Sequence, residues 1–337
     1  MQEVVLYVLS KGGGKMIFKK KLKVDLKTIN LLVTPFCNLK CKMCEYTVGT
    51  QNVDAMTIEE LKSVISQARE LGLERLELSG GEPMVIKDIY DIIGYSKSIG
   101  VKRIVMMTNG VLIGEDEAKK LVEAGLDDVV FSLEGNEELN DYIRGEGSFK
   151  KTVNAIKLFQ KYNSVNCIRV NITLNRLNYS TTLDFIKYLV EELNVKSISI
   201  NPYHAYMFGP ENKYVNDLKI TDEDMDKVKD TIEEIITYVK SKDIDFSHEN
   251  YLRKFIDFFK GEKLMPLYGC DVPQNSCAID VVGGVHACWG DKELSGNIRE
   301  TSLKKIVSCK HYLEFCKDAL NKKCEGCLNT CYDRIYN

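Results

Sequence analysis

Cysteines are the residues of this 337-residue chain whose number and spacing could do the most chemistry. The chain shows neither the residue order of a signal peptide nor an apolar run of the roughly 18 residues that span a membrane, so we expect a cytoplasmic protein. Disulfides are disfavoured there, and clustered cysteines instead favour metal binding. The twelve cysteines are Cys37, Cys41 and Cys44 in one group, Cys270, Cys277, Cys288, Cys309, Cys316, Cys324, Cys327 and Cys331 in another, and Cys167 between them.

The first group has the spacing C-x3-C-x2-C and directly follows an apolar run, residues 31–36, that predicts a buried strand. Three thiolates on one loop can hold three irons of a cubane cluster and leave the fourth iron open to a further ligand. A zinc knuckle is the alternative interpretation. Structural zinc normally takes four ligands, however, and no fourth Cys or His lies nearby in the sequence.

The second group offers enough thiolates for a closed site. A predicted hairpin over residues 278–288 brings two of its sulfurs together, and a C-x2-C pair near the end of the chain supplies two more. Four thiolates complete either a cubane with no open iron or the tetrahedral site of a zinc ribbon, and both remain open. The predicted ligands are Cys270, Cys288, Cys324 and Cys327, with Cys277 and Cys331 competing for one position.

Three other cysteines are expected in the core. Cys309 and Cys316 are seven residues apart on a predicted helix, which lies near residues 302–315, and they therefore share one face of it. Cys167 adjoins a predicted strand and is expected to be a buried thiol.

Strands and helices alternate along the body of the chain. Six predicted βα units imply a parallel sheet with right-handed crossovers, and six are too few for a closed eight-stranded barrel. We therefore predict an α/β fold, a partial (β/α)6 TIM-like barrel with a small C-terminal cysteine-rich α+β domain. The predicted strands are 31–36, 75–79, 103–107, 128–133, 168–173 and 196–200. The predicted domains are an N-terminal extension (1–27), the barrel (28–202), a helical connector (203–265) and the cysteine-rich domain (266–337).

Polar motifs end several of these strands. Since the carboxyl ends of parallel strands form one face, we expect the motifs to meet the first cysteine loop there. Glycines among them allow close approach of the backbone. The motifs are Ser79-Gly80-Gly81-Glu82-Pro83, Thr108-Asn109-Gly110 and Ser132-Leu133-Glu134-Gly135, and Arg144 follows in the segment Asp141–Phe149.

This combination resembles the radical S-adenosylmethionine (SAM) superfamily. The resemblance implies a [4Fe–4S] cluster on Cys37, Cys41 and Cys44 whose open iron chelates SAM, and an electron donor such as flavodoxin or ferredoxin. Reductive cleavage of SAM then gives a 5′-deoxyadenosyl radical, which abstracts a hydrogen atom from the substrate. The implied SAM-binding residues are Gly80, Gly81, Glu82, Asn109, Ser132, Glu134 and Arg144, with Asn171 a weaker candidate. Met43 departs from the family, which often has an aromatic residue at this position.

The C-terminal cysteines resemble the SPASM/twitch extension of that superfamily. A full SPASM pattern supplies cysteines for two clusters, whereas this chain has C-x2-C-x3-C and then ends. We therefore expect one auxiliary [4Fe–4S] cluster, with two as the alternative. Such a cluster suits a net oxidation, because it can accept the electron that a substrate radical must lose, or it can gate a thiol hydrogen donor.

Three functions remain in competition. The first is oxidation (dehydrogenation) or epimerisation of a small molecule such as a sugar or aminocyclitol. The second is oxidation, crosslinking or epimerisation of a ribosomally made peptide, and the third is a non-catalytic iron–sulfur scaffold. The roughly 28 residues before the first barrel strand are few for a peptide-recognition domain, which favours the small molecule. The net charge of −3 predicts neither nucleic acid nor a membrane as partner. Tyr203, His204 and Asp280 are unranked candidates for contact with the substrate or for proton transfer, and no general base is assigned.

Overall fold

The computed structural model describes residues 3–9, 15–21, 24–44, 53–162, 167–204, 213–266 and 269–329. Its main feature is a ten-stranded sheet in the order β12-β11-β10-β3-β4-β5-β6-β7-β8-β9. The strands from β3 to β8 are all parallel and confirm six barrel strands. Five lie within two residues of their predicted bounds, but the first was predicted over 31–36 and instead ends at Leu32, so residues 33–36 belong to the loop that leads to Cys37. The sheet curves but does not close, because β3 and β8 pair with further strands, which confirms a partial barrel. The six are β3 (Thr28–Leu32), β4 (Arg75–Ser79), β5 (Arg103–Thr108), β6 (Asp128–Ser132), β7 (Cys167–Leu174) and β8 (Ser197–Pro202).

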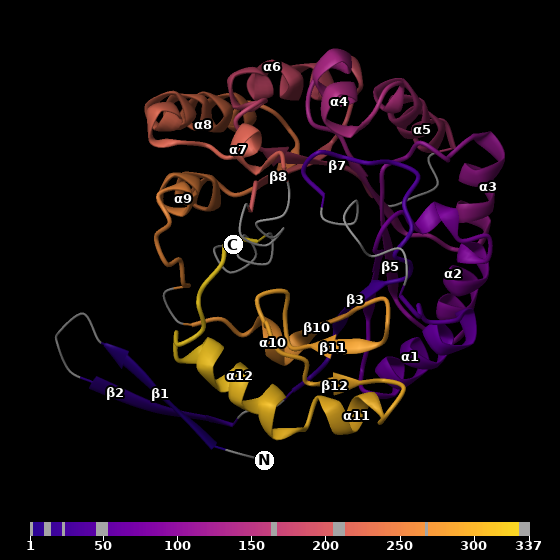
Figure 1. Cartoon of the computed structure of the whole chain (residues 1–337), viewed down its shortest axis with the longest axis vertical. Coiled ribbons are helices and arrows are strands. Elements are labelled where there is room, and N and C mark those ends of the chain that lie inside the picture. The colour runs from indigo at the N-terminus through magenta and orange to yellow at the C-terminus, as the bar shows by residue number, and fades with distance from the viewer. Residues whose placement is uncertain are drawn as a thin grey trace.

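Helices follow the strands and cover the convex outer side of the sheet (Figure 1). The strand side chains that face them, such as Leu76, Ile104 and Val129, are fully buried in one apolar core. The alternate positions point to the concave side and are largely polar, as the period of two along a strand requires. The helices are α1 (Ile58–Glu70), α2 (Ile89–Ser98), α3 (Glu115–Glu123), α4 (Glu137–Arg144), α5 (Ser148–Tyr162), α6 (Thr182–Lys187), α7 (Val215–Leu218), α8 (Met225–Lys240) and α9 (Glu249–Phe259).

The cysteine-rich region continues the barrel sheet instead of forming a separate layer. Strand β10 (Ser276–Ile279) pairs in parallel with β3, and β11 (Gly284–His286) returns antiparallel to it, which confirms the predicted hairpin. Strand β12 (Gly296–Asn297) lies at that edge, and β9 (Asp245–Phe246) lies at the other. Figure 1 shows this region, coloured orange to yellow, beside the start of β3. The last elements are α10 (Val272–Asn275), α11 (Leu303–Ile306) and α12 (Lys310–Leu320).

The single helix predicted over 302–315 is wrong, because the chain makes a turn at Val307–Ser308 and is extended at Cys309, between α11 and α12. Cys309 has φ −69° and ψ 162°, and its Sγ caps α12 by accepting a hydrogen bond from the Tyr312 amide. Cys309 and Cys316 therefore do not share one continuous helix. Cys316 is still fully buried, and its thiol donates to the Pro273 carbonyl at 3.4 Å, as expected of a core residue.

One arginine fastens the C-terminal region to the barrel. The Arg299 guanidinium contacts the Glu60 carboxylate at 2.6 Å and that of Asp54 at 2.9 Å. Glu60 belongs to a capping box with Thr57 that starts α1. The segment that leads into α1 is thereby tied to both halves of the molecule.

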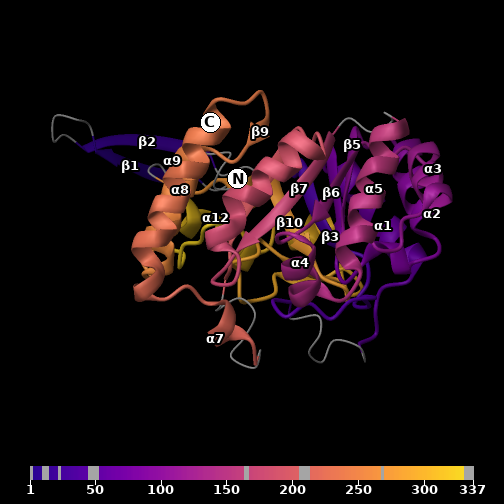
Figure 2. The same ribbon diagram turned by 90° about the horizontal axis from the view of Figure 1, so that it is seen from above.

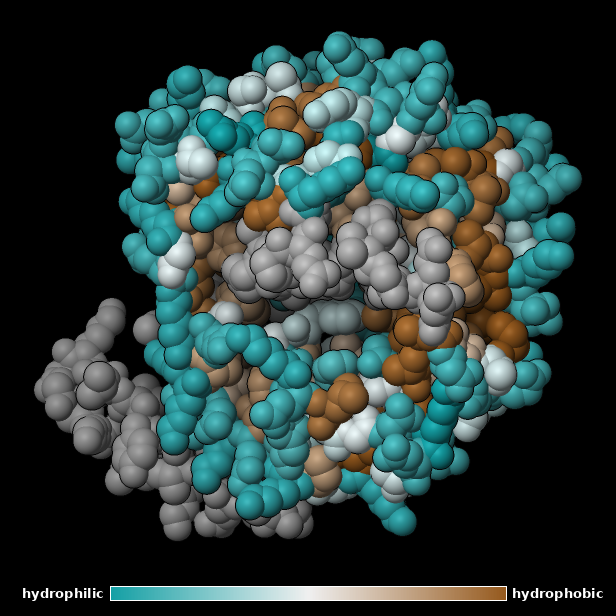
Figure 3. All heavy atoms as spheres, viewed as in Figure 1, coloured by the Kyte–Doolittle hydropathy of each residue, from teal (hydrophilic) through white to brown (hydrophobic). Residues whose placement is uncertain are grey.

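A separate two-stranded sheet, β1 (Glu3–Leu9) with β2 (Lys15–Lys21), extends away from the body (Figures 1 and 2). In the space-filling view, hydrophilic residues cover most of the helical rim, and the surface is hollowed near its centre (Figure 3). Among the described residues, no helix combines the length and apolar character needed to cross a bilayer.

Candidate active site

The loop of the first cysteines leaves β3 and is held by the end of β4. The Gly81 amide donates to the Thr34 carbonyl at 2.7 Å, and the Glu82 amide donates to the Phe36 carbonyl at 2.8 Å. A Cβ atom on Gly81 would lie only 2.0 Å from the Phe36 oxygen, and Gly80 has a φ of +126°. The two glycines therefore let this edge approach the backbone that leads into Cys37. Their contact with SAM remains a prediction.

Glu82 links that edge to the end of β5. Its buried carboxylate accepts hydrogen bonds from Thr108 Oγ1 at 2.6 Å, the Asn109 amide at 2.7 Å and the Met84 amide at 3.1 Å. Burial raises the pKa of Glu82, although these three donors oppose the shift. Since both oxygens are occupied, Glu82 positions the turn at Asn109 and leaves its carboxylate little capacity for a ligand.

Asn109, which Glu82 positions, contacts the cysteine loop through its side chain. Its Nδ2 donates to Asn38 Oδ1 at 2.8 Å and lies 3.9 Å from Cys37 Sγ. Its carbonyl accepts from Thr152 Oγ1 at 2.6 Å, so α5 holds the turn from behind. The sequence motif found Asn109 but gave no sign of Asn38 or Thr152.

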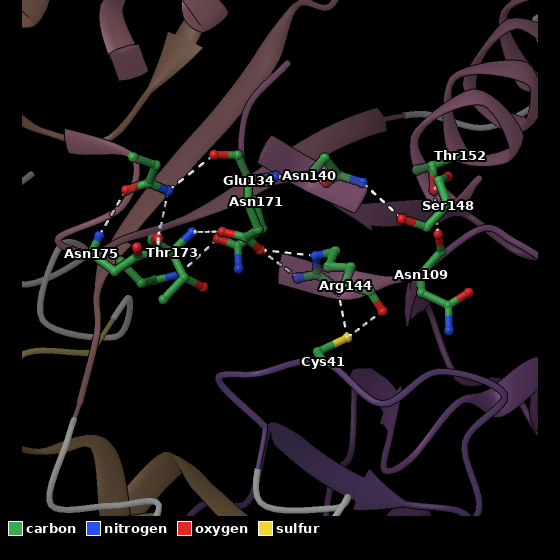
Figure 4. Close-up of polar contacts among 12 residues, drawn as sticks. Cys41, Asn109, Glu134, Asn140, Arg144, Ser148, Thr152, Asn171, Thr173 and Asn175 are labelled. Atoms are coloured by element: carbon green, nitrogen blue, oxygen red, sulfur yellow. Dashed lines mark hydrogen bonds and ion pairs between the residues drawn. The ribbon is translucent and has the colours of Figure 1, made fainter. Parts of the chain in front are cut away.

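A buried ion pair stands on the other side of the loop (Figure 4). Glu134 Oε1 accepts from Arg144 Nε at 3.0 Å and Nη2 at 2.5 Å, and Glu134 Oε2 accepts from the Thr173 amide at 2.8 Å. Arg144 Nη1 lies 3.9 Å from Cys41 Sγ, and the Arg144 carbonyl is 3.7 Å from the same sulfur. Arg144 therefore lies between Glu134 and Cys41 and contacts both.

The charges of this group are coupled. Burial lowers the pKa of Arg144, but the charge and hydrogen bond of Glu134, together with the nearby Cys41 and Cys44, outweigh burial and raise this pKa above its usual value. The guanidinium therefore stays charged. Burial raises the pKa of the Cys41 thiol, whereas Arg144 opposes that shift. A fixed positive charge beside a cysteine loop favours both thiolate and an anionic ligand group.

A helix that the sequence analysis missed places Arg144. Helix α4 begins after Asn136 and ends at Arg144, and the Asp141 carboxylate at its end accepts from the amides of Gly147 and Phe149. Within α4, Asn140 accepts from the Glu134 amide at 3.0 Å and donates to Ser148 Oγ at 2.9 Å (Figure 4). The short segment 134–149 is therefore stiff.

Polar side chains also line the concave side of β6 to β8. Ser132 pairs in register with Asn171. Asn171 Oδ1 accepts from Ser199 Oγ at 2.9 Å and from Asn201 Nδ2 at 2.7 Å, while Asn201 Oδ1 accepts from Tyr251 Oη at 3.0 Å. Asn171 thus belongs to a side-chain network on the inner face of the sheet.

Three other candidate residues have structural partners. Met43 is buried with Ile143 and Tyr203 in a small apolar cluster. His204 Nε2 lies 3.0 Å from the Leu328 carbonyl, and burial lowers the pKa of His204 to about 4. Asp280 accepts from two amides of its own hairpin turn, and its Oδ2 lies 3.5 Å from His286 Nε2. These contacts give no support to a proton-transfer role for His204.

The second cysteine group surrounds a cavity of about 260 Å³. Cys324 Sγ lies 3.5 Å from Met265 Sδ in its wall, and Cys288 Sγ accepts from the Gly290 amide at 3.2 Å. Burial raises the pKa of Cys270 and Cys288 to about 12. Cys277 is buried but does not line the cavity, and Cys331 lies outside the described residues. The four cysteines that line it are Cys270, Cys288, Cys324 and Cys327, the predicted set.

The shape of this cavity suits a polynuclear cluster. In the part of the chain that the structure describes, no three His, Cys, Asp or Glu side chains converge as ligands of a single metal ion. Four thiols around this volume form a donor set that suits an iron–sulfur cluster, because each iron of a cubane takes one thiolate. The donor sets of both groups therefore fit iron–sulfur clusters.

Comparison with known proteins agrees with this geometry. Residues 31–189 match the radical SAM superfamily, and residues 270–328 match SPASM, an iron–sulfur cluster-binding domain. The chain belongs to the radical SAM superfamily. It carries a C-terminal SPASM domain, and its cofactors are a [4Fe–4S] cluster, SAM and auxiliary iron–sulfur.

Relatives of this radical SAM protein differ in their named activities. A GTP 3′,8-cyclase of Peptoclostridium acidaminophilum is 34% identical over 184 residues, which span 52% of this chain and 56% of that protein. An AdoMet-dependent heme synthase of Methanosarcina barkeri is 27% identical over 288 residues, 81% of this chain and 80% of that protein.

Solved structures share the fold. Streptococcus suis SuiB bound to its precursor peptide SuiA has a TM-score of 0.69 and 17% identity, over 90% of this chain and 72% of SuiB. Native anSMEcpe with bound AdoMet has a TM-score of 0.68 and 19% identity, over 92% of this chain and 94% of that one. At these identities the likeness shows the fold alone.

Proposed function

We propose that this radical SAM protein binds SAM at the Cys37–Cys44 loop and removes a hydrogen atom from a small-molecule substrate, for net oxidation or epimerisation. The observation that carries the proposal is the pair of buried networks, Glu82–Asn109 and Glu134–Arg144, that flank this loop. Both end beside a cysteine sulfur. A scaffold protein would have no need of a fixed, buried arginine at that place.

The residues have distinct proposed tasks. Cys37, Cys41 and Cys44 hold the SAM-binding cluster, which when bound supplies the electron that cleaves the sulfonium bond. Arg144, held by Glu134, presents its charge to the SAM carboxylate. Glu134 and Glu82 act as positioning residues, because their oxygens already accept hydrogen bonds from the protein.

The remaining proposed contacts come from the strand ends. Gly80 and Gly81 contribute backbone at the SAM amino group, Asn109 contributes its amide, and Ser132 faces the ribose. Ser132 lies on the concave side in register with Asn171, so the polar network of β6 to β8 forms the inner wall of this pocket.

The SPASM cavity has a proposed role in electron transfer. Cys270, Cys288, Cys324 and Cys327 would hold one auxiliary [4Fe–4S] cluster in the cavity that they line. Trp289, next to Cys288, also lines this cavity and is 43% exposed, so the site lies close to the protein surface. A cluster there could pass an electron from the substrate side to an external partner such as a flavodoxin or ferredoxin.

The printed names of the curated relatives favour a small molecule as substrate. The cyclase is named for GTP, and the heme synthase, which aligns over most of both chains, is named for heme. The alternative is a ribosomally made peptide. SuiB was solved with a precursor peptide, but its 17% identity supports only a common fold.

Deuterium transfer tests the proposal. Extract from cells grown in deuterated medium is divided by size into metabolite and peptide fractions, and each is incubated with reconstituted protein, unlabelled SAM and reductant. Deuterium in 5′-deoxyadenosine from the metabolite fraction, before and after protease treatment, supports a small-molecule substrate. Label only from the peptide fraction, abolished by protease, would establish the peptide alternative. The Arg144→Ala variant serves as the negative control.

A further inference from the structure

A second polar cavity, of about 340 Å³, lies at the opposite end of the barrel strands from the cysteine loop. Arg75, Arg103 and Asp128 are the first residues of β4, β5 and β6, whereas the SAM motifs follow the last residues of the same strands. Arg169 joins them from β7. The cavity is lined by Arg75, Arg103, Val105, Asp128, Val129, Val130 and Arg169.

The register of the sheet explains why these side chains meet. Arg75 pairs with Arg103, Val105 pairs with Asp128, and Val130 pairs with Arg169. Partners across neighbouring strands point to the same face, and so do alternate residues along one strand. These six side chains therefore lie on the concave side, opposite the apolar residues, Val129 among them, that face the helices.

The lining carries three guanidinium groups and one carboxylate. Each arginine already has acidic partners: Arg75 Nε contacts Glu77 at 2.6 Å and Arg75 Nη1 lies 4.0 Å from Asp128, Arg169 Nη2 contacts Asp245 at 2.5 Å, and Arg103 Nε contacts Asp128. A guanidinium has five N–H donors in a planar fork, so these ion pairs do not use them all. Such a fork suits the oxygens of a phosphate or carboxylate.

Asp128 also lines this cavity, and in the described part of the chain one of its oxygens has no hydrogen-bond donor. It is only 3% exposed, and one of its oxygens, Oδ1, is buried without a hydrogen-bond partner among the described residues. A buried acceptor left without a donor is energetically unfavourable, because it has lost its hydrogen bonds to water without replacement. The other oxygen, Oδ2, is held by Arg103 and Arg75, so a ligand hydroxyl in the cavity would have to supply the donor to Oδ1 where it stands. The missing group is a hydrogen-bond donor, not a further anion.

We propose that this cavity binds a phosphate group that also carries a hydroxyl: its anionic oxygens accept from the arginines, and its hydroxyl donates to Asp128. Orthophosphate satisfies both demands, because near neutral pH it keeps a proton. A phosphate monoester satisfies them when a neighbouring hydroxyl supplies the donor. Sulfate has the same shape and a similar charge, but it has no proton to give, so its oxygens would face the Asp128 carboxylate with no hydrogen bond between them.

Isothermal titration of the reconstituted full-length protein with orthophosphate, glycerol 3-phosphate and sulfate tests this. We expect one phosphate ligand per chain and at least tenfold weaker binding of sulfate. Tighter binding of orthophosphate identifies the free ion, and tighter binding of glycerol 3-phosphate identifies a phosphorylated metabolite. Absence of binding by both, or equal affinity for phosphate and sulfate, would overturn the proposal.

Two variants test the role of Asp128 and the role of the arginines separately. Asp128→Asn replaces an acceptor by an amide that can donate, so the preference for phosphate over sulfate should disappear while an anion still binds. Arg169→Gln keeps Asp128 and should weaken both anions while the preference remains. Unchanged discrimination in a folded Asp128→Asn protein would refute the role of Asp128. Should that variant fail to fold, unaltered affinity in Arg169→Gln would refute the site. Neither readout depends on SAM chemistry.

Discussion

Replacement of Glu134 by glutamine examines the buried pair that fixes Arg144. Both Glu134 oxygens accept hydrogen bonds, Oε1 from Arg144 and Oε2 from the Thr173 amide. A glutamine has only one acceptor, so its amide nitrogen must face either the guanidinium or the Thr173 N–H. The variant therefore loses the ion pair and also gains an opposed pair of donors.

The expected magnitude follows from burial. Glu134 is fully buried, and the Arg144 side chain is 11% exposed. Removal of one partner from a buried ion pair typically destabilises a protein by about 3–5 kcal/mol, because the other charge remains without compensation. We expect a loss in this range, together with SAM binding weakened about tenfold, which corresponds to about 1.4 kcal/mol.

The assay compares matched variants by denaturant unfolding and by SAM titration under anaerobic conditions. Glu233→Gln is the control, since it makes the same chemical change in a bidentate ion pair with Arg253 whose carboxylate is 45% exposed. Surface pairs contribute little, so this variant should unfold close to the wild type and bind SAM normally. If Glu134→Gln were no more destabilised than Glu233→Gln, the reasoning about the buried pair would be refuted.

Three further predictions concern other parts of the molecule. The pKa of His204 is about 4 in the folded protein and about 6.5 in the unfolded chain. As the pH drops from 6.5 to 4, His204 therefore becomes protonated in the unfolded chain but not in the folded protein, and the free energy of unfolding should fall by about 3 kcal/mol. Unfolding of His204→Gln should lack this component, and an identical pH profile would contradict it. Gly81→Ala should abolish SAM binding through its clash with the cysteine-loop backbone, whereas Gly94→Ala, with open space around its Cβ, should bind normally. Cys288→Ser should lower the reconstituted iron content by about four atoms per chain and Cys277→Ser should not; the reverse result would exchange their roles.

Local patterns were sufficient to predict most of the elements. Apolar residues such as Leu76 and Leu78, alternating with polar ones, marked the barrel strands, and the Thr57–Glu60 capping box marked the start of α1. Helix α4 was missed because its sequence is strongly polar, and only the fold supplies the buried surroundings of Asn140. The parallel pairing of β10 with β3 joins residues that are far apart in the chain, and no local signal specifies it.

In the candidate site, too, the sequence predicted the residues but not the contacts between them. The motifs that end predicted strands contain Glu82, Asn109 and Glu134, and the resemblance to the radical SAM superfamily singled out these residues together with Arg144. It could not show that Glu82 holds Asn109, or that Glu134 holds Arg144, because those contacts depend on how neighbouring strands and α4 come together. The structure therefore changes the proposed role of the two carboxylates from ligand contact to positioning.

The most direct test of the central claim is the formation of 5′-deoxyadenosine by anaerobically reconstituted protein given SAM and a strong reductant. The account predicts this product from the wild type. It also predicts none from a Cys37→Ala, Cys41→Ala, Cys44→Ala variant that still retains about four irons in the SPASM cavity. Wild-type protein with a full complement of iron and sulfide that gives no 5′-deoxyadenosine would contradict it.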